Sequence, residues 1–346
     1  MAHNPHQRSL ALLTARGFRN PFLTPSGTAA LEATALLLDL QPGDEVILPS
    51  FTFVSTALPF LRTPAHLRFA DLDRETLNIS PESVADLLGP KTRALIVMHY
   101  GGNPCDMDRL LALQKGGRIA LVEDAAHAMG ATYRGRPLGA VGDVGILSFD
   151  PQKNVSCGEG GALCVNRPEW DGPAGIICAL GTNREAFERG EVSEYTWVGP
   201  GIKAGLAESA AHVLVNQLEH LDTITRQRRA IWRRYAEGLR ALEARGDIRF
   251  PKFSEESNGH LFYFLASDPA TRNDLLAVLN REGIEAKTHY SPLHLSPVSV
   301  ARGWQAPLEN TEWACRRIIR LPLHNAMTEA EQARIIESVE RFFGAR

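Results

Sequence analysis

The chain has 346 residues and a formal net charge of −3, from 37 Lys and Arg against 40 Asp and Glu. Hydrophobic residues make up 44% and charged residues 22% of the chain, which excludes a disordered, fibrous or disulfide-scaffold protein. Since the charge is nearly balanced, we expect neither nucleic acid nor a membrane as a partner. The length corresponds to two domains or one large one.

The five cysteines are scattered and form no CxxC pair: Cys105, Cys157, Cys164, Cys178 and Cys315. This pattern favours neither a zinc site nor an extracellular disulfide framework. No stretch approaches the ~18 consecutive apolar residues of a membrane-spanning helix, and the amino-terminal apolar run is too short for a signal peptide. We therefore expect a cytoplasmic protein without a bound metal.

The first half of the chain alternates helical patterns with short runs rich in β-branched residues. A helix is predicted from Thr28 to the turn at Pro42, with two more over 81–88 and 107–115. Six apolar runs predict strands at 45–48, 66–70, 94–98, 119–123, 144–149 and 161–165. Because several runs are apolar throughout, they fit a mostly parallel sheet that is buried on both faces. The sequence therefore predicts an α/β fold with helices flanking the sheet.

The second half opens with a long helical pattern that runs from Ala207 to about residue 244. After Pro251 we predict, in order, a strand over 260–265, a helix over 271–282, a strand over 284–290 and a helix over 329–343. We therefore predict a large α/β domain over residues 1–230 and a small carboxyl-terminal α+β domain over residues 231–346.

Five arginines cluster on the long helical pattern: Arg226, Arg228, Arg229, Arg233 and Arg234. We interpret them as a solvated helix face, which is the usual role of a charge run. A contact with a nucleotide diphosphate is the alternative.

The most informative stretch is SFDPQKNVSCGEGG, residues 148–161. It places a single lysine, Lys153, after an apolar strand and before a glycine-rich turn. A lysine held away from water loses proton affinity, so its neutral amine can form a Schiff base with an aldehyde cofactor. Taken alone, Lys153 would be interpreted as an exposed loop residue and the glycines as a β-turn, but the surrounding motifs change that interpretation.

The segment 122–130 places Asp124 at the carboxyl end of an apolar strand, the edge that lines the ligand crevice of an open α/β sheet. In pyridoxal phosphate enzymes, a carboxylate at such a site pairs with the protonated pyridine nitrogen. The alternative is a cap for a helix that begins at Ala125. His127 is either a donor to the phenolic oxygen of that cofactor or a core histidine.

The segment 24–31 places small hydroxyl residues around Gly27 at the start of an apolar helix. Free N–H groups and the helix dipole suit a phosphate there, with an ordinary helix cap as the alternative. Ser148 can add a further hydroxyl to the phosphate. Phe53 follows a strand end and either stacks on a flat heteroaromatic ring or belongs to the core.

Together these motifs resemble the DegT/StrS-type sugar aminotransferases, a family of fold-type I pyridoxal phosphate enzymes. The matching segments are SGTAAL (26–31), GDEVILPSFTFVST (43–56), EDAAH (123–127) and residues 148–161. Weaker matches follow at 217–219, 289–294 and 320–323. Three further segments resemble a branch of the family that aminates dTDP-4-keto-6-deoxyhexoses: 23–26, 38–46 and 181–197.

The resemblance implies a fold-type I pyridoxal phosphate enzyme that moves an amino group from L-glutamate to a keto-sugar nucleotide, as a homodimer with shared active sites. Lys153 would hold the cofactor covalently and move the proton as general base and acid. Cofactor contacts are implied for Ser26, Gly27, Thr28, Phe53, Asp124, His127 and Ser148. Substrate contacts are implied for Tyr195, His289 and Tyr290.

The chain departs from the family pattern at three places. Most relatives have Gln where His127 stands, and a titrating histidine would give a pH effect that a Gln enzyme lacks. Lys203 stands where relatives usually place an Asn that reaches the cofactor phosphate of the partner subunit; a solvent-facing lysine is the alternative. Only 25 residues precede Ser26, fewer than in relatives, which would alter the mouth of the active site.

Three other functions fit parts of the pattern. A dehydratase or lyase on the same fold is disfavoured, because family dehydratases replace the lysine with histidine and Lys153 is present. A noncatalytic homologue that only binds pyridoxal phosphate is the second. An aminotransferase that acts on a keto substrate without a nucleotide is the third.

Overall fold

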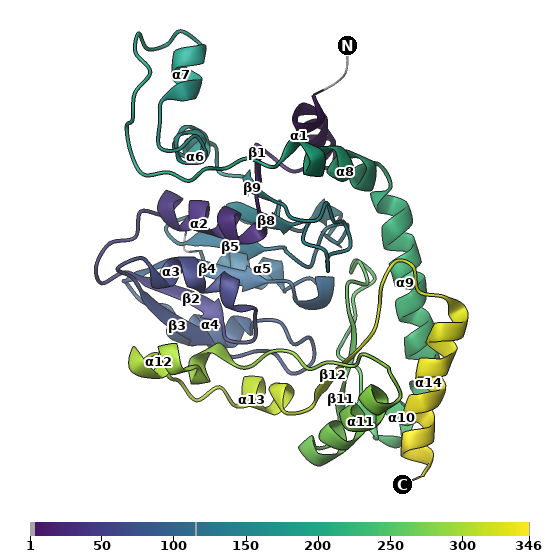
Figure 1. Ribbon diagram of the computed structural model, residues 1–346. Coiled ribbons are helices and arrows are strands. Elements are labelled where there is room, and N and C mark those ends of the chain that lie inside the picture. Colours follow the sequence, from purple (N-terminus) through teal and green to yellow (C-terminus); the bar gives the residue numbers. More distant parts are fainter. Residues whose placement is uncertain (1–3, 115, 346) are drawn as a thin grey trace.

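The computed structural model describes residues 4–114 and 116–345, and its centre is a seven-stranded sheet (Figure 1). The strands lie in the order β1 (Pro21–Thr24), β9 (Gly161–Val165), β8 (Val144–Ser148), β5 (Ala120–Asp124), β4 (Thr92–Met98), β2 (Glu45–Pro49) and β3 (His66–Ala70). The five strands from β8 to β3 run parallel, and β9 is antiparallel to both of its neighbours. Every residue of β5, β8 and β9 is buried, as their apolar sequences predict.

Helices cover both faces of this sheet. The core on one face contains residues of α2 (Gly27–Leu37) and α6 (Asp171–Cys178), together with side chains of β2, β4 and β8. The opposite face packs against α4 (Pro81–Leu87) and α5 (Met107–Ala112). Next to them, α1 (Pro5–Ala15) packs on α8 (Glu208–Glu219). The fold class is therefore α/β, as predicted.

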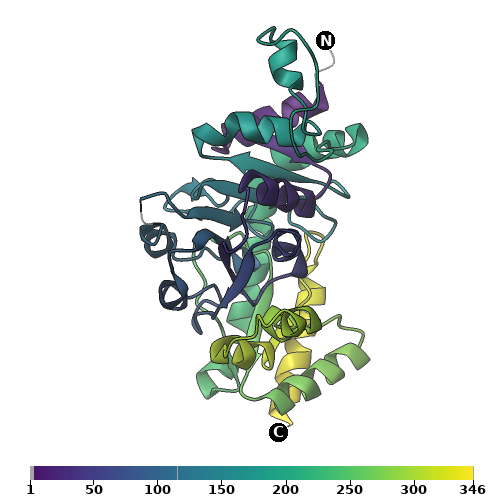
Figure 2. The same ribbon diagram turned by 90° about the vertical axis from the view of Figure 1, so that its left-hand side faces the viewer.

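A second, antiparallel sheet has the order β10 (Ile248–Arg249), β11 (Phe262–Ala266) and β12 (Ile318–Leu321). Its core includes residues of α9 (Leu221–Gly238), α10 (Arg240–Arg245), α11 (Pro269–Arg281) and α14 (Glu329–Gly344). The two views place this sheet and α14 at the end of the molecule opposite α7 (Arg184–Glu188) (Figures 1 and 2).

The remaining elements are short. They are η1 (Val54–Thr56), α3 (Leu58–Leu61), η2 (Tyr100–Gly102), β6 (Thr132–Tyr133), β7 (Arg136–Pro137), η3 (Pro168–Trp170), η4 (Leu293–Leu295), α12 (Pro297–Ala301) and α13 (Glu309–Cys315). Within the described ranges, none of the helices is both long enough and apolar enough to cross a membrane.

All six strands predicted in the first half are present, but the second half departs from the predictions. The strand expected over 284–290 is wrong: only Lys287 pairs there, as an isolated bridge to Arg320, and the strand beside β11 is β12. The long helical pattern is divided into α8, α9 and α10, which meet at His220 and Leu239. Residue 230 lies within α9, and the division into two domains stays a prediction.

Arg228 corrects the prediction that the arginines of α9 form a solvated face. Its side chain is buried, and its guanidinium donates to the carbonyl oxygens of His260 (2.7 Å) and Leu323 (3.2 Å) and to Asn325 Oδ1 (2.6 Å). Burial lowers the pKa of Arg228 to about 10. This arginine therefore holds α9 against the segments that flank the small sheet.

Candidate active site

The carboxyl ends of the parallel strands open into a cavity of about 490 Å³. This size lies within the ~300–1,000 Å³ of small-molecule sites. Ten of the twelve predicted site residues line it: Ser26, Gly27, Thr28, Phe53, Asp124, His127, Ser148, Lys153, His289 and Tyr290. The opposite wall comes from segments around the small sheet and adds three residues that the sequence analysis did not single out, His260, Leu261 and Arg320.

One end of the cavity is the amino terminus of α2. Ser26 caps this helix by accepting a hydrogen bond from Ala29 N (3.1 Å). Because Gly27 and Thr28 are the first two residues of the helix, their N–H groups have no intrahelical acceptor. A Cβ on Gly27 would lie 3.1 Å from Ser148 Cβ, and one on Gly161 would lie only 2.5 Å from Gly27 N. The glycines thus let the backbone and the Ser148 hydroxyl converge on one place, where the helix dipole favours an anion.

The wall of the cavity also carries the carboxylate of Asp124. This residue ends β5, where Thr56 Oγ1 donates to its Oδ2 at 2.7 Å and Ala126 N donates to its Oδ1 at 3.1 Å. Residues 125–130 form turns, so Asp124 does not cap a helix. The carboxylate is buried and held by two donors, an arrangement that suits one fixed cationic partner.

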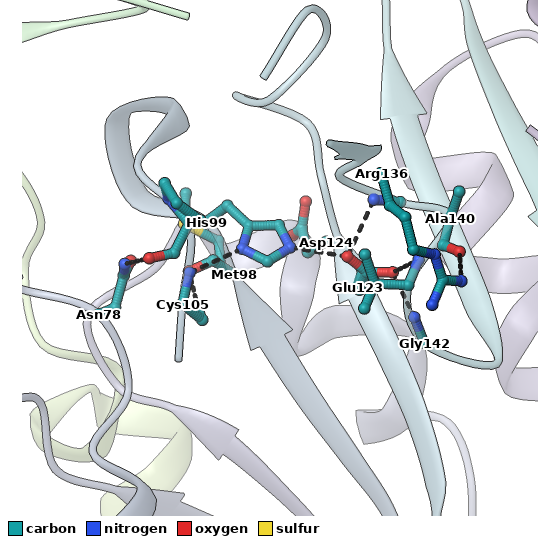
Figure 3. A network of polar contacts seen from close by, with 12 residues as sticks. Asn78, Met98, His99, Cys105, Glu123, Asp124, Arg136, Ala140 and Gly142 are labelled. Carbon is teal, nitrogen blue, oxygen red and sulfur yellow. Dashed lines mark hydrogen bonds and ion pairs between the residues drawn. The ribbon is translucent and has the colours of Figure 1, made fainter. Parts of the chain in front are cut away.

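The neighbouring residue, Glu123, anchors this strand end from the other face of the sheet, because successive side chains of a strand point to opposite faces (Figure 3). Its fully buried carboxylate accepts from the N–H groups of Gly139 (2.9 Å), Val141 (2.7 Å) and Gly142 (2.6 Å). A fourth donor is His99 Nε2, at 3.0 Å. Since four donors compensate its charge, Glu123 fixes β5 to the loop that leads into β8.

Lys153 lies in the loop between β8 and β9, on the same side of the sheet as Asp124. Lys153 N donates to Asp150 O at 2.9 Å, and the loop is closed by bonds from Phe149 N to Gly160 O (2.8 Å) and from Cys157 N to Phe149 O (3.0 Å). Burial lowers the pKa of the Lys153 amine, while the carboxylates of Asp124 and Asp150 oppose that shift. The geometry therefore increases the share of neutral, nucleophilic amine at a given pH.

The surroundings of His127 favour the neutral form of its imidazole. Gly101 N donates to its Nδ1 at 3.3 Å, so the single proton of the neutral ring lies on Nε2. Burial lowers the pKa of His127 well below its ordinary value, and the charge of Lys153 adds to this effect. Both effects oppose the pH effect expected from the sequence, which stays a prediction; the neutral ring would present an N–H donor to the cavity, as a Gln amide would.

Two aromatic residues stand at the cavity wall. Phe53 directly precedes η1 and is 56% exposed, so it is not a core residue. Its ring centroid lies 6.5 Å from that of Tyr290, and the Tyr290 hydroxyl lies 3.5 Å from His127 Nε2. The exposed ring of Phe53 is thus free to stack on a flat ligand.

The wall around the small sheet carries two separate hydrogen-bonded groups of side chains. Arg320 on β12 donates from Nη1 to His289 Nε2, and His289 Nδ1 lies 3.1 Å from the Tyr100 hydroxyl. His260 Nδ1 lies 2.6 Å from the Oδ1 of Asn154, the residue that follows Lys153 in the sequence. The sequence carried little signal for Arg320 and His260, because each acquires its neighbours only when distant segments meet.

Two predicted residues lie outside this cavity. Tyr195 is 51% exposed in the segment after α7, and Lys203 is an exposed residue whose backbone forms a bridge with Ala179. Both belong to the segment 180–203, called the arm here, which projects from the body of the molecule with α7 (Figures 1 and 2). Their roles stay predictions.

The residues of the cavity fit pyridoxal phosphate. The free N–H groups of Gly27 and Thr28, with the Ser148 hydroxyl, would hold its phosphate, and Asp124 would pair with its ring nitrogen. His127 Nε2–H is a donor for an oxygen, and the Lys153 amine is the nucleophile for the aldehyde. Bound there, the cofactor would supply an electron sink for proton removal at an adjacent carbon.

Such a fold with a lysine, a strand-end carboxylate and a helix amino terminus around one cavity defines a pyridoxal phosphate enzyme. The chain matches the DegT/DnrJ/EryC1/StrS aminotransferase family over residues 16–340. It therefore belongs to this family and is a pyridoxal phosphate-dependent aminotransferase.

Three solved structures illustrate the similarity. TlmJ, an aminotransferase from Streptoalloteichus hindustanus, is 31% identical, with a TM-score of 0.90 over 99% of this chain and 91% of that chain. DesV from S. venezuelae is 30% identical, with a TM-score of 0.87 over 99% of this chain and 90% of that one. The pyridoxamine phosphate (PMP) form of Spr1654, a putative sugar aminotransferase from Streptococcus pneumoniae, is 25% identical, with a TM-score of 0.90 over 100% and 93% of the two chains.

Proposed function

We propose that the protein transfers the amino group of L-glutamate to a keto-sugar nucleotide of the dTDP-4-keto-6-deoxyhexose type. The observation that carries this proposal is the position of Lys153, which lines both the cofactor cavity and a second cavity of about 620 Å³. Gln152, His260, Leu261 and Arg320 also line both cavities, so there is room for a large substrate next to the reactive amine. The similarity to a putative sugar aminotransferase supports a sugar as acceptor.

In this reaction the residues of the chain have separable tasks. Lys153 would take the proton from the carbon that bears the donor nitrogen and would give it back as general acid. The bound cofactor would keep the nitrogen, and a water molecule would supply the oxygen of the released keto acid. Asp124 would hold the protonated ring nitrogen of the cofactor, and the α2 amino terminus would hold its phosphate. In the second half-reaction the same residues would act in reverse: the keto sugar would receive the nitrogen and its carbonyl oxygen would leave as water.

We also propose a cytoplasmic homodimer in which the arm of one subunit reaches the cavity of the other. The arm carries exposed apolar side chains, among them Trp197 (76% exposed) and Leu180 (54%), whose burial against a second copy would be favourable. Lys203 would then contribute a point charge to the cofactor phosphate of the partner subunit, and Tyr195 would approach its substrate.

The acceptor is tested by mass spectrometry of the products formed from L-glutamate and a panel of keto sugars. The panel contains dTDP-, UDP- and GDP-linked 4-keto-6-deoxyhexoses and the corresponding sugars without nucleotide. We expect an amino sugar only from the nucleotide-linked members, with dTDP preferred. A product from the free keto sugars alone would contradict the nucleotide part of the proposal, and loss of water instead of gain of nitrogen would favour a dehydratase.

The shared site is tested by mixing two inactive variants. Lys153→Ala removes the amine of each site, and Lys203→Glu replaces the positive charge that each arm offers by a negative one. If the arm completes the partner's site, a mixed dimer has one site with both lysines, and mixing after partial unfolding and reassembly restores activity. If each chain is complete by itself, Lys203→Glu is active alone and mixing adds nothing.

A further inference from the structure

We propose that Arg228 and Asn325 are positioning residues for Lys153, and that they act through Asn154, the residue that follows the lysine in the sequence. The proposal rests on the role proposed above for Lys153. It gives a function to a buried arginine of α9 and a surface asparagine, neither of which belongs to the cofactor contacts.

The starting observation is a closed ring of hydrogen bonds around the residue after Lys153. Arg228 Nη1 donates to Asn325 Oδ1 (2.6 Å), and Asn325 Nδ2 donates to Asn154 O (3.2 Å). On the other side, Arg228 Nη2 donates to His260 O (2.7 Å), and His260 Nδ1 lies 2.6 Å from Asn154 Oδ1. Since an amide oxygen only accepts, the proton of His260 lies on Nδ1. Asn154 is therefore held at its main chain and at its side chain by two groups that Arg228 holds in turn.

The surroundings of Arg228 show what this side chain does. It is buried, and no carboxylate within residues 4–114 and 116–345 forms an ion pair with it. Arg233, on the same helix, is exposed and pairs with Glu255 at 2.6 Å. A buried charge without a counter-charge is unfavourable for stability. The planar guanidinium, however, offers several N–H donors in a fixed fork, which suits a residue that holds two separate segments at once.

Asn154 also has a feature that stability does not explain. Its side chain is buried, and its Nδ2 has no hydrogen-bond partner within the described chain. A buried donor without an acceptor destabilises the fold, and an apolar side chain at this position would avoid that cost. The contacts that Asn154 does make are those of the ring, so we infer that its task is to fix the main chain beside the lysine.

The ring acts on the side of Lys153 that the rest of the loop leaves free. On the amino-terminal side, Lys153 N donates to Asp150 O at 2.9 Å. On the carboxyl-terminal side, the planar peptide bond joins the lysine to Asn154, so fixing Asn154 limits the direction in which the lysine side chain leaves the main chain. The reactive amine needs this constraint, because a displacement of ~1 Å can slow a reaction by ~10²-fold.

The test breaks the ring at its exposed member. Asn325→Ala removes both hydrogen bonds of this side chain. Asn280→Ala is the matched control, since the exposed Asn280 also donates to main-chain carbonyls, those of Leu276 and Ala286, and lies outside both cavities. Arg228→Lys keeps the charge without the fork and should act in the same direction as Asn325→Ala. Because Asn325 is exposed, its variant tests the ring even where Arg228→Lys does not fold.

The first readout is the reaction of the Lys153 amine with acetic anhydride in the full chain without cofactor, followed by mass spectrometry as a function of pH. Burial lowers the pKa of this amine, so the midpoint in the wild type should lie below that of an exposed lysine. We expect Asn325→Ala to raise the midpoint, because a looser loop admits water to the amine, and Asn280→Ala to leave it unchanged. Equal midpoints in the wild type and Asn325→Ala, or an equal rise in Asn280→Ala, overturn the proposal.

The second readout is the rate at which each substrate changes the absorbance of the holoenzyme. Asn325→Ala should slow the reactions with L-glutamate and with the keto-sugar nucleotide alike, by at least about tenfold, and keep both half-saturating concentrations within about twofold of the wild type. A change confined to half-saturation by the keto-sugar nucleotide overturns the proposal, since Asn325 would then bind this substrate from the wall of the second cavity. If L-glutamate changes nothing in the wild type, the proposed function fails, and the acetylation midpoints still test the ring.

Discussion

The two walls of the cavity are built in different ways. The wall of the seven-stranded sheet carries Gly27, Asp124 and Ser148 at the ends of strands and at the start of a helix, where the main chain itself fixes them. The opposite wall carries His289 and Arg320, which lie 31 positions apart in the sequence and meet through the Lys287–Arg320 backbone bridge and the hydrogen bond from Arg320 to His289. The first wall fits the cofactor, which takes part in both half-reactions. The second wall faces the space for the substrates, which differ between the two half-reactions. Substitutions should therefore have general effects on the first wall and substrate-specific effects on the second.

The largest effect on the first wall is expected for Lys153→Ala. Loss of the amine removes both the nucleophile and the proton carrier, so the rate of amino transfer should fall by roughly 10⁴-fold or more. The measurement is steady-state production of the amino sugar, with the thermal midpoint as control for folding. A variant that keeps even a tenth of the wild-type rate would show that another group carries the reaction.

The next largest effect is expected for Asp124→Asn, which keeps the shape of the side chain and removes its charge. The ring nitrogen would lose its carboxylate, and both half-reactions should slow by about 10²- to 10³-fold, as for loss of one preorganised electrostatic group. Single-turnover rates with each substrate separately would measure this. If only one half-reaction slows, Asp124 is a substrate residue, and the contrast between the walls is lost.

A stability effect is expected behind the same wall, at Glu123. Glu123→Gln leaves three backbone N–H groups and His99 without a charged acceptor, so the free energy of unfolding should fall by about 2–4 kcal/mol. Urea unfolding measures it, with the exposed Glu340→Gln as the matched control. An unchanged midpoint would mean that the buried carboxylate does not hold β5 in place.

The smallest effect is expected for His127→Gln. Because burial keeps the pKa of His127 well below its ordinary value, the imidazole is neutral throughout the pH range in which exposed histidines titrate. Replacing one neutral donor by another should leave the pH–rate profile unchanged and alter the rate by less than about fivefold, the worth of one net hydrogen bond. A pH dependence that disappears in the variant would restore the titrating role expected from the sequence.

The difference between the walls also explains what the sequence could predict. Gly27, Asp124 and Lys153 each follow or precede an apolar run, so the pattern that predicts the strand or helix also places the residue at its end. Parallel strands then bring those ends to one edge of the sheet. These residues were predictable because their positions depend on local structure and on a single topological rule.

The residues that sequence reasoning missed depend on distant contacts. Arg320 lies 31 positions from His289 along the chain, and β12 pairs with β11 after an intervening stretch that holds α11, η4, α12 and α13. Its neighbours Ile319 and Leu321 are typical residues of a buried strand and do not mark a functional site. The second strand of the small domain was moreover predicted over 284–290 and not at β12. Arg228 was misjudged for the same reason, because the carbonyls that bury it come from residues about 30 and 95 positions away.

The central claim, an aminotransferase centred on Lys153, is tested most directly by the absorbance of the bound cofactor. Purified protein loaded with pyridoxal phosphate should absorb at the edge of the visible range, lose that band when L-glutamate is added, and regain it when a keto-sugar nucleotide follows. The Lys153→Ala protein should show neither change. A wild-type band that no amino acid alters would contradict the account and leave a protein that only binds the cofactor.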